Sequence, residues 1–288
     1  MAHVGPGPAG PPPLGPEGFD WTSWQADPGV VAGLVVLGAA YTAAILWRRR
    51  LAPEARVEPL KAVSFGGALL LLFGVLTGPI HDLSDYYLFS AHMVQHMLLV
   101  FAMPPLLLYG TPGWMLRPLL RDPKLLQLGR LLTRPTGSFA TFNVILIAWH
   151  LPPLYNLAME QHPFHVLGHL LMMAGSVILW WPVLSPLDEL PRAPYPIQML
   201  YLFVVGLPMV MVAIFISMAD GLLYPYYASA PRIWPQLTPR ADQHLGGLIM
   251  WIPGGMVFLV ALSVVFFRWQ SAGGDDAAVP LAGARHGR

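Results

Sequence analysis

Long apolar stretches, separated by short polar segments, make up most of the chain. Seven stretches of 19 residues or more contain no Asp, Glu, Lys or Arg, namely residues 28–47, 62–81, 86–116, 135–159, 161–187, 193–219 and 243–267. A helix of about 20 apolar residues crosses a bilayer. Inside the bilayer the backbone must also satisfy its own hydrogen bonds, which favours helices. The pattern therefore predicts an all-α polytopic membrane protein, a bundle of seven transmembrane helices.

The positions of Lys and Arg predict the orientation of this bundle. Fourteen of the sixteen follow the first, third, fifth or seventh stretch, and only Arg232 and Arg240 lie in the alternate loops. Cytoplasmic loops retain positive charge during insertion. We therefore expect the N-terminus outside, the C-terminus in the cytoplasm and an odd number of spans, in a bacterial inner membrane.

The chain divides into three regions by composition. Residues 1–27 begin with a Pro/Gly-rich segment and are expected to form a disordered external tail, which includes His3. Residues 28–267 form the predicted transmembrane domain. Residues 268–288, with His286, are expected to form a flexible cytoplasmic tail.

Composition excludes several classes of protein. With 55% hydrophobic and 11% charged residues, the chain is not a soluble globule. A net charge of +1 with scattered arginines gives no nucleic-acid surface, which leaves the lipid bilayer as the expected surroundings. Cysteine is absent, so disulfides, thiolate metal sites and cysteine nucleophiles are excluded. No motif of a nucleotide site, hydrolase or metalloprotease is present, and we expect no enzymatic activity.

Histidines gather at the predicted outer ends of the spans. Their positions are His81, His92, His96, His150, His165, His169 and His244, while His162 falls in the adjoining outer loop. Two pairs, His92 with His96 and His165 with His169, have a spacing of four, which places both rings on one helix face. We interpret these seven histidines as a shared metal site.

Methionines and carboxylates near the same ends indicate which metal. Met93 and Met97 each follow a histidine of the first pair. Further methionines at or near the outer half of the spans are Met159, Met172, Met173, Met218 and Met250. Thioether and imidazole ligands together favour copper, as Cu(I) more than Cu(II). Carboxylates on the same side could be ligands or could hold the second ring nitrogen of a ligand, namely Asp82, Asp85, Glu160, Asp220 and Asp242. Asp82 and Asp242 are the better candidates, because each lies next to or near a histidine at a span end.

Two other local patterns carry structural expectations. Pro104 with Pro105, and Pro253 with the following glycines, should kink the third and seventh spans. Tyr155 and Tyr227 belong to a set of aromatic residues near span ends that we expect to anchor the protein at the membrane interface.

Four segments in sequence order carry a family resemblance. They are SAHMVQHMLLVFAMPPLLLYGTP at Ser90–Pro112, AWHLPPLYN at Ala148–Asn156, the His165–His169 pair followed by WWPVL at Trp180–Leu184, and DQHLGGLIMWIPG at Asp242–Gly254. Across roughly residues 60–267 the chain resembles the multi-spanning CtaG family of cytochrome c oxidase assembly factors, associated with caa3-type oxidases.

The resemblance implies a seven-helix protein that matures haem-copper oxidase, with copper delivered to the Cu-B centre of subunit I. His92, His96, His150, His165 and His169 match motif histidines, and Asp242 with Gln243 matches the motif of the last span. His81 and His244 enter the candidate site through the topology alone. A periplasmic copper donor would be a further partner.

Two other functions fit the same residues. A copper permease would use methionines deeper in the bundle as stepping sites, namely Met103, Met209, Met211 and Met256. A haem-binding membrane protein would use the same outer histidines as axial ligands.

Overall fold

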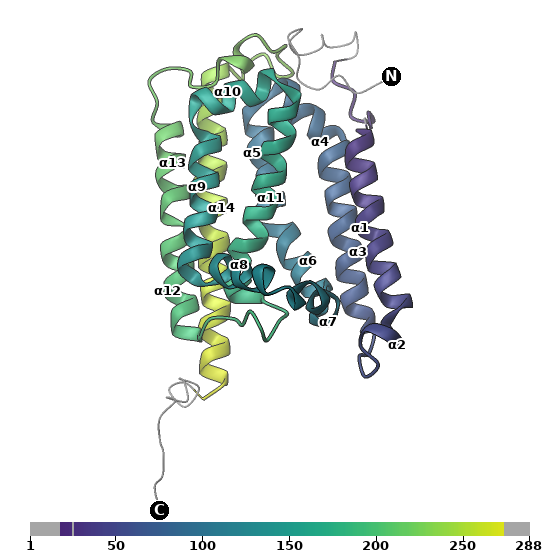
Figure 1. The fold of residues 1–288 in the computed structure, drawn as a ribbon. Coiled ribbons are helices and arrows are strands. Elements are labelled where there is room, and N and C mark those ends of the chain that lie inside the picture. Colours follow the sequence, from purple (N-terminus) through teal and green to yellow (C-terminus); the bar gives the residue numbers. More distant parts are fainter. Residues whose placement is uncertain (1–17, 25, 274–288) are drawn as a thin grey trace, which may run out of the picture.

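The structure, a computed structural model, describes residues 18–24 and 26–273 and consists of long helices running between two ends of a bundle (Figure 1). The long elements are α1 Pro28–Leu46, α3 Pro59–Thr77, α5 Phe89–Met97 with α6 Met103–Gly110, α9 Pro135–His150, α11 His162–Leu184, α12 Tyr195–Val205 with α13 Leu207–Ser217, and α14 Pro239–Ser271. The short elements are α2 Arg48–Leu51, α4 Pro79–Asp82, α7 Gly113–Leu116, α8 Pro123–Thr133, α10 Pro152–Glu160, the π-helices η1 Leu83–Tyr87 and η2 Leu98–Ala102, and the 3₁₀ helices η3 Arg117–Arg121 and η4 Pro225–Ala228. The predicted all-helical class is confirmed.

Six of the described helices are long and apolar enough to cross a membrane. They cover Pro28–Leu46, Pro59–Thr77, Phe89–Gly110, His162–Leu184, Tyr195–Ser217 and Pro239–Ser271. The predicted span 135–159 is not one helix, because it divides into α9 and α10. Leu151 between them is extended, as expected for a residue that precedes the pair Pro152 and Pro153. With 16 residues, α9 is about 24 Å long.

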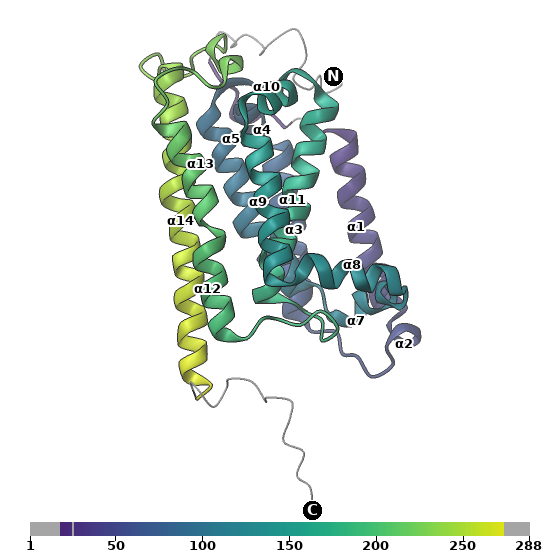
Figure 2. The ribbon, with the colours of Figure 1, turned by 60° about the vertical axis from the view of Figure 1, so that its left-hand side comes forward.

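Helix α9 nevertheless lies inside the bundle, against α11 and α13, and α10 lies across the end at which α9 stops (Figures 1 and 2). We call this end the histidine end, because α9 stops there at His150 while α5 and α11 begin there. At the opposite end α8 crosses beneath the bundle.

The expected kinks take two different forms. In the third span, the π-helix η2 separates α5 from α6 and ends just ahead of Pro104. Around Pro253, in contrast, α14 continues without interruption for 33 residues. The sixth span, for which no break was predicted, divides into α12 and α13 at Gly206.

Parts of both predicted tails pack on the bundle. Phe19 meets the edge of the Tyr87 ring, and Trp24 stacks on Phe73 of α3. At the other terminus, α14 extends to Ser271, beyond the predicted end of the domain at 267. The remainder of the two predicted tails, residues 1–17, 25 and 274–288, with His3 and His286, lies outside the described residues.

Candidate metal centre

Five buried histidines from three helices converge at the histidine end. His92 and His96 belong to the first turns of α5, His150 ends α9, and His165 and His169 belong to the first turns of α11. Ring centres are 4.3 Å apart within the first pair and 4.5 Å apart within the second. Between helices, the rings of His96 and His169 are 5.3 Å apart and those of His96 and His150 are 6.2 Å apart. The spacing of four in the sequence thus produces two facing pairs and a fifth ring beside them.

These rings surround one small cavity. Its wall consists of His92, His96, Trp149, His150, Tyr155, Ala158, Met159, His165, Gly168 and His169. About 10 Å³ is open to the centre of a water-sized sphere, which is roughly the room that one water molecule requires. The space among the rings therefore suits a single small ion, and the buried thioether of Met159 belongs to its wall.

The histidines are near one another without forming a finished coordination sphere. In the described part of the chain, no three His, Asp or Glu side chains are arranged so that they could hold one metal ion as they stand. Ring centres 4.3 to 6.2 Å apart are close enough for side-chain rotations to bring nitrogen atoms to a shared point. Binding of an ion by three rings therefore requires such rotations.

The hydrogen bonds of the rings determine which nitrogens are free. Nδ1 of His150 is 2.7 Å from Leu146 O, and Nδ1 of His169 is 3.2 Å from His165 O. Among the described residues, both ring nitrogens of His96, Nδ1 of His92, Nε2 of His165 and Oδ2 of Asp85 have no hydrogen-bond partner. A buried polar atom without a partner costs about 1–3 kcal/mol, so a ligand that bound these nitrogens would recover that energy.

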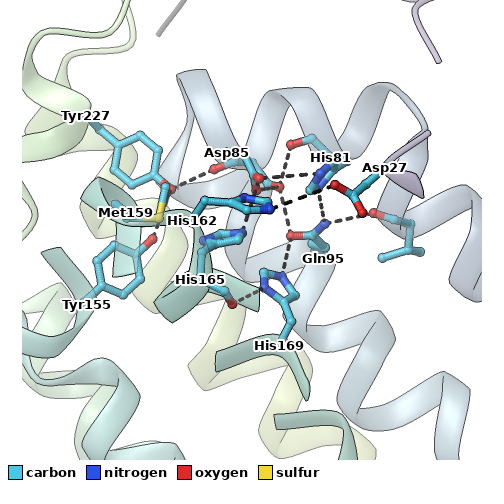
Figure 3. A network of polar contacts seen from close by, with 12 residues as sticks. Asp27, His81, Asp85, Gln95, Tyr155, Met159, His162, His165, His169 and Tyr227 are labelled. Carbon is cyan, nitrogen blue, oxygen red and sulfur yellow. Dashed lines mark hydrogen bonds and ion pairs between the residues drawn. The ribbon is translucent and has the colours of Figure 1, made fainter. Parts of the chain in front are cut away.

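A buried carboxylate connects the cavity to a neighbouring histidine (Figure 3). Asp85, which is 0% exposed, lies in the middle of η1. Its Oδ2 is 3.2 Å from His165 Nε2 and 3.5 Å from His81 Nε2, and its Oδ1 lies 3.0 Å from the Ser84 hydroxyl oxygen. Burial alone would raise the pKa of Asp85, but His165 and His81 outweigh burial and hold that pKa well below its usual range. Asp85 is therefore a carboxylate at neutral pH.

Gln95 joins the two sides of this network. Its Nε2 donates to Val75 O at 2.8 Å and is 3.2 Å from His81 Nδ1. Its Oε1 accepts from the Ser84 hydroxyl at 2.9 Å and lies 3.3 Å from His169 Nε2. One amide side chain thus contacts histidines of both α4 and α11 (Figure 3).

Two tyrosines extend the network away from the cavity. Tyr227 donates to Ser84 O at 2.7 Å, and its hydroxyl is 3.0 Å from that of Tyr155. Burial and the neighbouring Tyr155 raise the pKa of Tyr227, which keeps its hydroxyl protonated. Both tyrosines are buried, so the prediction that they anchor the protein at the membrane interface is wrong.

Helix α14 holds α5 in place. The Asp242 carboxylate, 0% exposed, accepts from the backbone amides of Phe89 at 2.8 Å and Ser90 at 3.1 Å. These amides belong to the first turn of α5, where unpaired N–H groups and the helix dipole favour an anion. Asp242 therefore positions the helix that carries His92 and His96, and its oxygens contact amides rather than the cavity.

Several other predicted site residues lie apart from the cavity. His244 is exposed, and its Nδ1 is 2.9 Å from Ser217 O in a different cleft. Met93 and Met97 are one position past the histidines along α5, about 100° around the helix, and both lie near glycines of α14. His81 belongs to the Asp85 network and does not line the cavity.

Three further expectations are corrected by the structure. Met211 and Met256, expected deep in the bundle, are 62% and 58% exposed, whereas Met103 and Met209 are buried. His162, expected in a loop, is the first residue of α11, with Nε2 3.9 Å from Asp27 Oδ2.

Sequence reasoning missed part of the cavity and its network. Gln95 carries a signal, since it precedes His96 in the HMVQH segment. Asp85 is four residues after His81, a spacing that brings side chains together on a helix, but the choice of Asp82 and Asp242 passed over it. Met159 is among the methionines expected near the outer ends, but the break at Leu151 that places α10 over the cavity was not anticipated. Trp149 carries no such signal.

Comparisons with known proteins identify the family of this chain and several relatives. A family model described as cytochrome c oxidase caa3 assembly factor matches residues 39–272. An uncharacterized protein of Mycobacterium leprae is 26% identical over 288 residues, which is 92% of this chain and 42% of that protein. Uncharacterized proteins of Mycobacterium bovis and Mycobacterium tuberculosis are each 25% identical over 268 residues, which is 86% of this chain and 39% of theirs.

The chain thus spans about two fifths of the length of these curated relatives. No solved structure matches it. The family match covers most of the chain, including every histidine that lines the cavity, and confirms the resemblance of the sequence motifs. The chain is a member of the family of cytochrome c oxidase caa3 assembly factors.

Proposed function

We propose that this assembly factor binds one Cu(I) ion in the histidine cavity and delivers it to the Cu-B centre of oxidase subunit I. The convergence of five buried histidines on one cavity carries the proposal. Imidazole and thioether ligands suit Cu(I), and Met159 supplies the thioether that Met93 and Met97 were expected to supply. Copper is the cargo in this account, and the protein acts without catalysing a reaction.

A negative charge beside the cavity supports a cation there. The Asp85 carboxylate is buried, and none of the Lys or Arg residues in the described ranges forms an ion pair with it. A buried charge without a counter-charge is costly. A cation among the histidines would lie near this carboxylate and would offset part of that cost.

The size of the cavity argues against haem. The space among the rings has room for about one water molecule, whereas a porphyrin would require α5, α9 and α11 to separate. The permease alternative also loses support, because Met211 and Met256 point away from the bundle interior. A chain of methionines through the membrane is therefore incomplete.

We further propose seven membrane crossings, with α9 as a short fourth span. In both views α1 begins at the histidine end and α14 finishes at the opposite end, which requires an odd number of crossings (Figures 1 and 2). The excess of Lys and Arg follows the helices that finish at that opposite end. Such an excess is typical of cytoplasmic loops, which supports a cytoplasmic location of this end in a bacterial inner membrane. The histidine end then faces outward, where a periplasmic donor could load it.

Delivery can be tested in a bacterium that makes a caa3-type oxidase and lacks this protein. We expect the wild-type chain to restore copper at the Cu-B centre and oxidase activity, and the His92→Ala, His96→Ala double variant to restore neither. His244→Ala is the matched control, since it removes a histidine at the same end but outside the cavity. Full restoration by the double variant, at equal membrane abundance, would show that the protein assists assembly without carrying copper.

A further inference from the structure

Helix α8 carries an apolar side that the described part of the protein leaves open. Leu125, Leu128 and Leu131 are 46%, 49% and 50% exposed, and no residue of α8 is buried. Their spacing of three places the leucines along one side of the helix. A different side faces the bundle, where a Cβ atom at Gly129 would lie 3.0 Å from Leu190. The leucine side of α8 therefore requires a partner outside the described chain.

The remaining side of α8 is polar and positively charged. Gln127 and Arg130 are each two positions after one of these leucines, which is about 200° around the helix. Lys124 near the start of α8 and Arg134 just after its end add two cations. Within the described ranges, none of the three cations forms an ion pair, and the Asp122 carboxylate accepts from the Lys124 backbone amide at 2.8 Å. The open leucines are thus bordered by cations that lack a counter-charge.

The depth of α8 favours a lipid surface as the missing partner. Only Arg134 separates the end of α8 at Thr133 from the start of α9 at Pro135. At about 24 Å, α9 is shorter than the hydrocarbon core of a bilayer, which is about 30 Å thick. In both views α8 also lies closer to the middle of the bundle than the lower ends of α12 and α14 do (Figures 1 and 2). If α9 crosses the membrane, α8 lies at the level of the lipid headgroups.

We propose that α8 is an interfacial helix, which inserts its leucines among lipid acyl chains and binds the headgroups of anionic phospholipids through Lys124, Arg130 and Arg134. Helices with one apolar and one basic side lie in membrane interfaces and are attracted to anionic lipids. Long cationic side chains reach the headgroups while their stems cover apolar surface. The inference rests on the proposed crossing of the membrane by α9 and is independent of copper.

Single cysteines can report the surroundings of α8, since the chain has no cysteine of its own. Leu125→Cys and Gln127→Cys place a bimane fluorophore on opposite sides of the helix. The full chain would be reconstituted in nanodiscs of phosphatidylcholine and phosphatidylglycerol, in which iodide reaches both membrane surfaces. We expect doxyl-labelled lipid to quench the label at 125 strongly, and iodide to quench the label at 127. Val144→Cys is the control for the crossing, because this side chain of α9 is 68% exposed and should be quenched by lipid alone.

The three labels separate a failure of the proposal from a failure of the topology. Quenching at 125 by iodide and not by lipid, with lipid quenching at 144, overturns the interfacial role of α8 and leaves the crossing by α9 standing. Protection of 125 from both quenchers would assign the leucines to a protein partner and also overturns the proposal. Iodide quenching at 144 contradicts the crossing by α9, and the interfacial helix falls with it.

The choice of headgroup is tested with the same label at 125. The ratio of quenching by doxyl-labelled phosphatidylglycerol to quenching by doxyl-labelled phosphatidylcholine measures the preference for anionic lipid. One cation near a membrane surface contributes about 5-fold to such a preference. We expect Arg130→Gln to lower the preference by about this factor, and Arg130→Lys, which conserves the charge, to retain it. Equal quenching by the two lipids in the chain that keeps all three cations overturns the binding of anionic headgroups.

Discussion

At the scale of single residues, two buried carboxylates near the cavity have different tasks. Asp242 accepts from backbone amides at the start of α5, and Asp85 contacts histidine rings. Sequence position favoured Asp242 because it is two residues before a histidine, yet that histidine, His244, is not at the cavity. The packing of α14 on α5 shows that Asp242 binds backbone amides, whereas Asp85 lies against histidine rings.

Removal of the Asp242 carboxylate should destabilise the protein. Asp242→Ala leaves two buried amides without an acceptor, so we expect a loss of about 3 kcal/mol in unfolding free energy. Asp242→Asn retains one acceptor oxygen and should lose less. Unfolding by dodecyl sulfate, followed by circular dichroism, measures both variants. Wild-type stability in Asp242→Ala would show that the amides of Phe89 and Ser90 find other partners.

Methionines around α5 and α10 should differ in their effect on copper. Met159 lines the cavity, whereas Met93 and Met97 pack near α14. We expect Met159→Leu to lower Cu(I) affinity about 10-fold and Met93→Leu to leave it unchanged, since both substitutions conserve side-chain volume. Competition with a chromophoric Cu(I) chelator measures the two affinities. A larger effect from Met93 than from Met159 would mean that α5 presents a different face to the ion.

At the scale of elements, the sequence predicts the long helices well and their interruptions poorly. Absence of charge over about 20 residues suffices to locate the spans, because the bilayer imposes one length on every crossing. The break at Leu151 and the π-helices η1 and η2 depend on local proline geometry and on packing between helices. Since α10 and η1 supply Met159, Tyr155 and Asp85, these unpredicted elements complete the cavity and its network.

Close approach of α9 and α11 depends on one glycine. A Cβ atom at Gly168 would lie 1.9 Å from Trp149 Nε1, far inside contact distance. We therefore expect Gly168→Ala to displace the Trp149 ring and to cost about 1–3 kcal/mol, with weakened Cu(I) binding because both residues line the cavity. Gly66→Ala in α3 is the matched control, as nothing lies within 4 Å of its Cβ position. Equal stability and copper affinity in both variants would contradict the tight packing of α9 on α11.

At the scale of the whole molecule, the fold places the histidines at one end and most cationic loops at the other. The sequence predicts this separation, since both patterns are tied to span ends. The resemblance also separates the five motif histidines, which line the cavity, from His81 and His244. What the sequence could not predict is that His81 serves the Asp85 network and that His244 lies in a different cleft.

The absence of cysteine makes the topology directly testable. Ser229→Cys lies at the histidine end beside η4, and Gln127→Cys lies in α8 at the opposite end; both side chains are exposed. In intact spheroplasts, we expect a membrane-impermeant maleimide to label the cysteine at 229 and to label the cysteine at 127 only after permeabilisation. The reverse pattern would invert the orientation, and labelling of both from outside would contradict an odd number of crossings.

The central claim is that copper binds among the histidines of α5, α9 and α11, and elemental analysis tests it most directly. Detergent-purified wild type, His244→Ala and a quadruple variant with alanine at His92, His96, His165 and His169 would be loaded with Cu(I) and washed. The account predicts about one copper per chain in the first two and none in the quadruple variant. Equal copper in all three proteins, or none in the wild type, would contradict the account and leave this protein's part in oxidase assembly to a mechanism without bound metal.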